Sequence, residues 1–523
     1  MRGLNMKEKI LKLLTEMVAI NSRTNTENER EIEDYLYGVL CGLPYFKAHG
    51  THFGQIALPG DSCGRRIVYG LVKGKSNKTV VLMNHHDVVG TEVYGTLEPY
   101  AFNMSELAKK LGTELLDEDA HKDLLSGEWL FGRGSCDMKG GIAVQLALLE
   151  DYSQNPEAGN LLFVSVPDEE SFSAGMRGAL WLFEEFEKDW DLEYKLLINC
   201  EPNEKIGHKQ VVSVGSVGKL LPVVLVQGKA VQIGSYYEGI NPILLLSEIV
   251  CSTEGDENLV EICGNEATVP PVWNFMRDLK DSYDFSLPQR AVGYCNILTF
   301  YKTPADIMQL FLEKCQLVVD RMQLGRKDKE EIKIMPYSEL FILAQKKKGF
   351  ATFFAKLQHD IEEVVHVQGS DYPSVTIQML QEVLNFANVT EPVIIIGFAP
   401  PYYPATNSVK LAGACFEKIM QTISNSLPVV FKQYFLGVSD CSYCGVDSPI
   451  AGDYYITNTP IWGSLYSFDI GALNRVKIPF VLLGPWGKSL HQRTERVNIV
   501  SLTEVLPPVL QNVIKDVWAK DII

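Results

Sequence analysis

Apolar and polar positions follow two patterns along the chain. Short continuous apolar runs occur at residues 79–83, 161–166, 195–198 and 480–483, and runs of this length predict buried strands. Between them, segments such as 141–152 have apolar positions every three to four residues, which predicts helices. Buried strands that alternate with helices indicate an α/β domain, with a mostly parallel mixed sheet flanked by helices.

The start and the middle of the chain add two further features. Residues 11–40 have the pattern of two amphipathic helices separated by a polar break. In the middle, two segments resemble strands with one exposed face (211–226 and 290–301), and two resemble helices (241–251 and 305–319). We therefore predict a smaller α+β domain inserted into the main one. The predicted boundaries are 1–211 and 400–523 for the main domain and 212–399 for the insert, with an extra helical segment near 325–390.

Composition narrows the class of protein. The 523 residues include 48 Lys and Arg against 65 Asp and Glu, a net charge of −17 that repels nucleic-acid phosphates. No stretch approaches the roughly 18 continuous apolar residues of a membrane span, and the first residues do not resemble a secretory signal. Eleven scattered cysteines favour a reducing compartment. The sequence thus predicts a cytoplasmic protein with neither nucleic acid nor membrane as partner.

Ionisable residues gather after the predicted strands. Histidine or carboxylate side chains follow all four apolar runs, and one more follows a glycine-rich stretch: His85, Asp87, Asp137, Asp168, Glu169, Glu170, Glu201 and His491. In open α/β sheets, ligands bind beyond the carboxyl ends of the strands. We therefore predict that these side chains meet at one site. His86 is interpreted as a loop histidine outside it.

The residue types at this site indicate metal chemistry. Two histidines and three carboxylates suit one or two divalent ions. Two ions about 3.5–4 Å apart need a bridging carboxylate, and one further carboxylate must stay off the metals to take a proton from water. The adjacent pair Glu169 and Glu170 suits this division, because neighbouring residues on an extended loop point in different directions. Asp87, two residues after His85, can hold the imidazole tautomer.

Five motifs occur in a fixed order around these residues. They are His-x-Asp at 85–87, GRGSCDMKGG at 132–141, Asp-Glu-Glu at 168–170, Glu-Pro at 201–202, and Gly-Pro at 484–485 followed by His491. At these positions the chain resembles the dinuclear zinc amidohydrolase family of aminoacylase, acetylornithine deacetylase, succinyl-diaminopimelate desuccinylase and glutamate carboxypeptidase. The segments YYEGINP, TVPPVW and GFAPPYYP further resemble the arginine-utilisation (RocB-type) proteins within it.

The resemblance implies a role for each residue. The cofactor would be two divalent metal ions, zinc or alternatively cobalt or manganese. Their ligands would be His85 and Glu201 for one ion, Glu170 and His491 for the other, and Asp137 as the bridge. Glu169 would be the general base and Asp87 would orient His85.

The resemblance also implies an activity and an architecture. The main domain would be catalytic, and the insert would be a movable lid. The reaction would be hydrolysis of an amide bond in a small N-acyl amino acid or dipeptide, within amino-acid catabolism such as arginine utilisation. Relatives often form homodimers through the lid, and the oligomeric state of this chain stays open.

One position departs from the family pattern. Where relatives have a lid histidine that helps to bind the oxyanion, this chain has Gln232, whose amide can donate a hydrogen bond but carries no charge. Loss of an oxyanion donor costs on the order of 100- to 1000-fold in turnover. A metal-binding family member with weak or no hydrolase activity is therefore one alternative, which the intact Glu169 disfavours. A related zinc aminopeptidase is another, which GRGSCDMKGG and the 290-residue interval from Glu201 to His491 disfavour.

Overall fold

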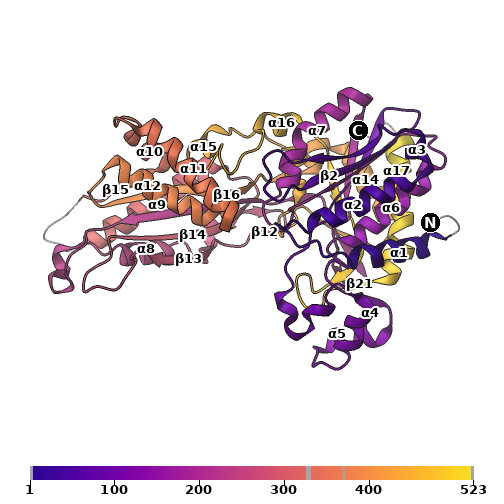
Figure 1. Ribbon diagram of the computed structural model, residues 1–523, viewed down its shortest axis with the longest axis horizontal. Coiled ribbons are helices and arrows are strands. Elements are labelled where there is room, and N and C mark those ends of the chain that lie inside the picture. The colour runs from indigo at the N-terminus through magenta and orange to yellow at the C-terminus, as the bar shows by residue number, and fades with distance from the viewer. Residues whose placement is uncertain (1–3, 325–330, 369–370, 520–523) are drawn as a thin grey trace. The chain divides into compact units, whose positions relative to one another are not determined.

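The four apolar runs form four neighbouring strands. The structure, a computed structural model, describes residues 4–324, 331–368 and 371–519. Residues 325–330 and 369–370 of the predicted extra helical segment lie outside the described residues. Two compact units are present: the first comprises Met1–Ser216, Thr406–Ser448 and Gly471–Ile523, and the second comprises Val217–Ala405 and Pro449–Ile470 (Figure 1). The segment 449–470, within the predicted main domain, thus groups with the second unit.

A nine-stranded mixed sheet forms the centre of the first unit. Its order is β1-β2-β5-β3-β6-β19-β8-β18, and β7 pairs with β8. The strands are β1 (Phe53–Ala57), β2 (Arg66–Val72), β3 (Lys78–His85), β5 (Asn160–Val166), β6 (Glu193–Asn199), β7 (Lys205–Ile206), β8 (Lys209–Ser213), β18 (Val429–Lys432) and β19 (Phe480–Leu482). The predicted runs are β3, β5, β6 and β19. They are parallel to one another, so their carboxyl ends lie at one edge.

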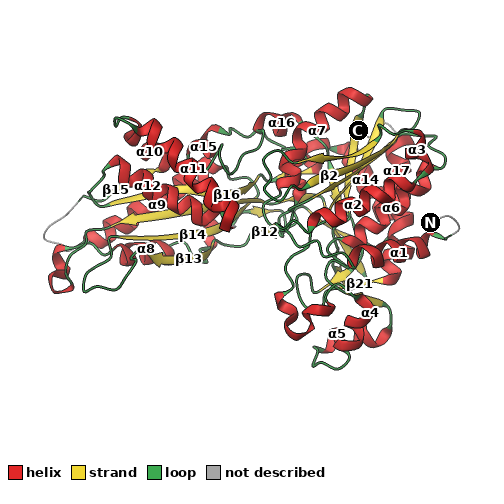
Figure 2. Cartoon of the chain, in the orientation of Figure 1, coloured by secondary structure: helices red, strands yellow, loops and turns green. Residues whose placement is uncertain are grey.

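Helices bury the faces of this sheet. They are α1 (Met6–Val18), α2 (Glu29–Gly42), α3 (Pro44–Ala48), α6 (Lys139–Ser153), α7 (Ala174–Trp190), α13 (Ser408–Ala412), α14 (Ala414–Ser426), α16 (Ile470–Arg475) and α17 (Leu506–Ala519), with short turns η4 (Asp440–Tyr443) and η5 (Ser501–Val505) (Figure 2). The N-terminal helices confirm the prediction for residues 11–40. Apolar side chains of α1, α6 and α17 share one core with β3 and β5, because a buried strand needs cover on both faces.

A small second sheet supports two loops of this unit. Its order is β20-β21-β4, formed by Gly487–Lys488, Arg496–Asn498 and Trp129–Phe131. The glycine-rich loop that contains Asp137 begins where β4 ends, and the loop with His491 joins β20 to β21. Strand β21 pairs with both neighbours, so one sheet anchors both loops. The segment before β4 forms η1 (Glu92–Tyr100), α4 (Met104–Leu111) and α5 (Glu118–Ser126) over a separate apolar cluster.

The second unit is an α+β structure. Its five-stranded sheet has the order β13-β14-β10-β16-β15, formed by Val272–Asp278, Arg290–Thr299, Gly218–Gln227, Val393–Tyr403 and Lys333–Pro336. The helices include α8 (Pro242–Cys251), α9 (Pro304–Gln323), α10 (Tyr337–Gln345), α11 (Phe350–Gln368), α12 (Tyr372–Ala387) and α15 (Asp453–Thr457). The predicted strands and helices of the middle segment are confirmed, but β10 is buried along nearly its whole length and has no exposed face, because it is paired on both sides inside the sheet. In the described part of the chain, no helix combines the length and apolar character needed to cross a membrane.

Candidate metal centre

Strand ends position three side chains of the candidate site, all in the first unit. His85 is the last residue of β3 and is 1% exposed. Glu201 follows β6 by two residues and is also buried. Glu170 lies in the turn after β5. These strands are neighbours in the sheet, which brings residues distant in sequence to the same edge.

The glycine-rich loop positions a fourth side chain, that of Asp137. Gly134 has a φ of +75°, a conformation that glycine adopts without strain. The peptide bond between Asp137 and Met138 is cis. A Cβ at Gly141 would lie 2.4 Å from the carbonyl oxygen of Cys200, so glycine allows α6 to approach the segment that carries Glu201.

The two carboxylate oxygens of Asp137 face two different histidines. Its Oδ1 lies 3.2 Å from Nε2 of His85, and its Oδ2 lies 3.3 Å from Nε2 of His491. Glu201 Oε1 lies 3.3 Å from the same nitrogen of His85, and Glu170 Oε2 lies 3.2 Å from that of His491. The five side chains therefore form two groups that share Asp137. These are the same groupings that the resemblance implies.

The donor set fits divalent metal ions. Ligand atoms of His85, Asp137 and Glu170 all lie within 4.8 Å of one another. Oε1 of Glu201 is buried and has no hydrogen-bond partner among the described residues, although it lies close to His85. A buried carboxylate oxygen without a hydrogen bond is costly unless a cation is nearby. Imidazole nitrogens and carboxylate oxygens are ligands that zinc, cobalt and manganese accept.

Close charges perturb the titration of these groups. Hydrogen bonds with Asp137 and Glu170 raise the pKa of His491 to about 10. Burial and the nearby Asp137 raise the pKa of Glu170 to about 7. Although burial opposes the shift, hydrogen bonds from His491 and His85 hold the pKa of Asp137 well below its usual range. The cluster thus concentrates negative charge that a bound cation would stabilise.

Asp87 contacts both the histidine and the turn after β5. It is fully buried, and its Oδ1 lies 3.4 Å from Nδ1 of His85. Its Oδ1 accepts a hydrogen bond from the backbone N–H of Glu169 and its Oδ2 accepts one from that of Glu170, each at 3.1 Å. Burial raises the pKa of Asp87, but the hydrogen bond and charge of His85, the charge of His86 and the N–H of Glu170 together outweigh it, and the net shift is downward. An ionised Asp87 can therefore hold the His85 ring in one orientation.

Glu169 is adjacent to Glu170, but its side chain is not among the four that surround Asp137. Its side chain is partly exposed. Burial raises the pKa of Glu169 well above its ordinary value, opposed by His85 and reinforced by Glu201 and Asp440. A carboxyl group with a raised pKa beside a metal site has the property that a general acid-base residue needs.

The sequence reasoning missed two residues that connect the loops of the site. Oε1 of Glu495 accepts backbone hydrogen bonds from Cys136 at 3.2 Å and Asp137 at 3.3 Å. Its Oε2 accepts a hydrogen bond from Nη1 of Arg133 at 2.5 Å, and Nη2 of Arg133 donates to the carbonyl oxygen of His491 at 3.1 Å. Two signals in the sequence could have found them. Arg133 is the arginine of the GRG motif, and Glu495 is a carboxylate four residues after His491.

Two other residues considered in the sequence lie elsewhere. His86 is buried, and its Nδ1 lies 2.9 Å from Oγ of Ser165, which agrees with its interpretation as a loop histidine. Gln232 lies in the second unit, immediately before η2 (Ile233–Glu238), and its side chain is exposed. Its role at an oxyanion or substrate site stays a prediction.

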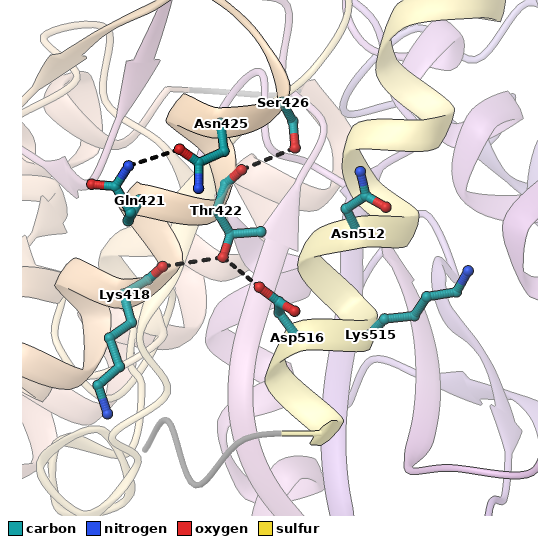
Figure 3. A pocket seen from close by; sticks show the side chains of 8 residues that line it. All are labelled: Lys418, Gln421, Thr422, Asn425, Ser426, Asn512, Lys515 and Asp516. Atoms are coloured by element: carbon teal, nitrogen blue, oxygen red, sulfur yellow. Dashed lines mark hydrogen bonds between the residues drawn. The ribbon is translucent and has the colours of Figure 1, made fainter.

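A surface hollow of about 570 Å³ lies between α14 and α17 (Figure 3). Its lining is polar, and Oγ1 of Thr422 donates a hydrogen bond to Oδ2 of Asp516 at 2.6 Å. Lys418 and Lys515, which also line it, are exposed. Neither Asp137 nor any of the four side chains around it belongs to this hollow. We assign no ligand to it.

Known proteins resemble this chain over most of its length. The model of peptidase family M20/M25/M40 matches residues 117–511. The uncharacterized protein YqjN of Bacillus subtilis is 30% identical over 96% of this chain and 95% of its own. Protein RocB of the same organism is 28% identical over 97% of this chain and 94% of its own, which confirms the predicted resemblance.

Solved structures share the fold of this chain. A tripeptidase from Staphylococcus aureus has a TM-score of 0.56 at 15% identity and covers 98% of this chain and 99% of its own. The YXEP protein of Bacillus subtilis, described as a dinuclear metal binding peptidase, has a TM-score of 0.51 at 12% identity and covers 98% of both chains. Such identities show the fold alone. The family match covers most of the chain, which therefore belongs to peptidase family M20/M25/M40, a family of metal-dependent hydrolases.

Proposed function

We propose that this chain holds two divalent metal ions and hydrolyses an amide bond of a small peptide or N-acyl amino acid. The observation that carries the proposal is the position of Asp137, whose two oxygens face two separate groups. His85 and Glu201 would hold one ion, and Glu170 and His491 the other. Asp137 would bridge both ions. Zinc is the proposed metal, with cobalt or manganese as alternatives.

The chain's own residues supply the proton transfers. When bound, the metal ions polarise the scissile carbonyl and lower the pKa of water to about 7. Glu169, which coordinates no ion in this proposal, takes a proton from the attacking water. It then returns that proton to the leaving amine, as a single acid-base residue can. Asp87 keeps His85 oriented and holds the backbone of Glu169 and Glu170.

The proposed substrate class is inferred from the related proteins. The structural neighbours include a tripeptidase, and the family is one of peptidases, which supports small peptides or related amides. The relationship to RocB supports a place in amino-acid catabolism such as arginine utilisation, in the cytoplasm. The second unit, Val217–Ala405 with Pro449–Ile470, would serve as the lid in place of the predicted 212–399, and Gln232 would donate a hydrogen bond to the substrate. Homodimerisation through the lid is part of the same proposal.

Exchange of the general base tests the mechanism. We expect Glu169→Gln to bind two ions per chain, like the wild type, and to lose about 10²- to 10⁴-fold in turnover, because a carboxamide cannot accept the proton. The measurements are metal content by mass spectrometry and amine release from a panel of dipeptides and N-acyl amino acids. Glu170→Gln is the matched control, with an expected loss of bound metal. Unchanged turnover in Glu169→Gln would contradict the assigned base.

A further inference from the structure

The turn after β5 is held by two buried carboxyl groups. The backbone N–H of Asp168 donates to Oε2 of Glu29 at 3.1 Å. The next two N–H groups, of Glu169 and Glu170, donate to the two oxygens of Asp87. Asp168 has a φ of +70°, a conformation that a non-glycine residue adopts only when its surroundings enforce it. Three successive peptide groups are thus fixed from two sides.

Arg65 connects Glu29 to this turn. Its Nη1 donates to Oδ1 of Asp168 at 2.5 Å and lies 3.2 Å from Oε1 of Glu29. Its Nε donates to Oδ1 of Asp61 at 3.0 Å. Arg65 is 5% exposed, Glu29 is 0% exposed and Asp168 is 1% exposed. Such a buried network is well placed to fix geometry, because breaking one partner leaves a charge without compensation.

Two residues of this network, Glu29 and Arg65, lie outside the five family motifs. Glu29 is the first residue of α2, and Arg65 directly precedes β2. Oδ2 of Asp168 also accepts a hydrogen bond from the backbone N–H of Ala174, at the start of α7. The fork of a guanidinium can serve several carboxylates at once, which an ammonium group cannot do with the same geometry. The side chain of Asp168 is therefore fixed at both oxygens.

We propose that Glu29 and Arg65 are positioning residues for Glu169 and Glu170, an inference that rests on the proposed function of the metal centre. Neither belongs to the set formed by Asp137 and the four side chains around it. They act through the backbone of Asp168, so that the next two side chains diverge, one toward the metals and one toward the attacking water. A displacement of about 1 Å at such a position is enough to cost on the order of 100-fold in rate.

Arg66 offers a matched control. It is the next residue along the chain, and its Nε donates to Oε2 of the buried Glu33 at 2.6 Å. Its other partners are Asp34, Gln55 and the carbonyl oxygen of Arg30. Arg66→Gln thus removes a partly buried ion pair at the start of β2 and none of the hydrogen bonds of the turn, and it leaves Glu33 with His86, whose Nε2 lies 3.7 Å from its Oε1.

Amide hydrogen exchange tests the geometry directly, in metal-free protein. We expect Arg65→Gln and Glu29→Ala to speed exchange at the amides of residues 168–170 by about 10-fold or more, because each loses a hydrogen bond that closes the turn. Glu29→Gln keeps an amide oxygen as acceptor and should retain most of the protection. Arg66→Gln should exchange at this turn like the wild type. Equal exchange at the turn in all four variants would overturn the proposal.

Cobalt binding and kinetics test the consequence for the site. The full chain is titrated with Co²⁺ alone, and turnover is measured on the dipeptide panel. We expect Arg65→Gln to weaken Co²⁺ binding by about 10- to 100-fold, as loss of support for a metal ligand does elsewhere. Turnover should fall by a similar factor with a smaller change in KM, and Glu29→Gln should recover most of what Glu29→Ala loses. If Arg65 had a purely structural role, Arg65→Gln and Arg66→Gln would both lose stability. Arg65→Gln would then show no selective loss of Co²⁺ affinity and turnover.

The outcomes separate the two proposals. If the wild type binds Co²⁺ and hydrolyses a peptide, but Arg65→Gln matches it in affinity and turnover, the positioning role is overturned and the proposed function stands. If the wild type binds no Co²⁺, the proposed function fails, and the positioning role falls with it.

Discussion

The two histidines of the candidate centre are held in different ways. His85 ends a central strand, and its side chain is 1% exposed with a carboxylate at each ring nitrogen. His491 lies in a loop with a φ of +62°, and its side chain is 49% exposed. The comparison shows that one half of the site belongs to the sheet and the other half to loops anchored beside it. The sheet-borne half should be the more rigid, and its loss the more damaging to the fold.

The largest expected effect is the loss of stability when the buried histidine, His85, is removed. His85→Ala leaves Asp87 and Glu201 buried without their cationic partner, and loss of one member of a buried pair costs about 3–5 kcal/mol. His491→Ala removes a partner that is 49% exposed, so water can compensate part of its loss at Asp137 and Glu170, and we expect a smaller destabilisation. Chemical denaturation of both metal-free variants would measure the difference. Equal destabilisation would show that the two halves are held alike.

A smaller effect is expected where Arg133 joins the two loops. Arg133→Lys keeps the positive charge beside Glu495 but cannot donate to both Glu495 and the carbonyl oxygen of His491 with the same geometry. We expect affinity for the ion at Glu170 and His491 to fall by about 10- to 100-fold, while the other ion is retained. Calorimetric titration with Zn²⁺ would resolve the two binding events. If the affinity for both ions falls equally, Arg133 would instead act through Asp137, which both ions would share.

A further expected effect concerns the pH dependence of stability. Burial and the nearby Asp87 raise the pKa of Glu29 to about 9, so the folded chain binds more protons than the unfolded chain between about pH 4.5 and 9. The contribution of Glu29 to stability is therefore present below pH 4.5 and is lost as the pH rises toward 9. Glu29→Gln cannot ionise and lacks this loss. The difference in melting temperature between wild type and variant should shift in favour of the variant as pH rises, and a constant difference would contradict the raised pKa.

The sequence predicted the parts of the fold and site that depend on local pattern. His85 and Glu201 lie within three residues of the ends of apolar runs, and the runs themselves identify the parallel strands that bring these residues together. Arg65 and Glu495 carry no such pattern, because their partners lie 103 and 358 residues away along the chain. A charged residue that becomes buried only through distant contacts looks like a surface residue in the sequence. The assigned ligand roles stay predictions until metal is measured.

The position of β19 affects the order in which the chain can fold during synthesis. This strand lies between β6 and β8, yet it is translated after the whole second unit. Until it emerges from the ribosome, the central sheet has a gap between two strands already made, and the loop with His491 does not yet exist. The second unit can thus fold while the first is still incomplete. Activity should therefore depend on late residues even though most of the site is encoded early.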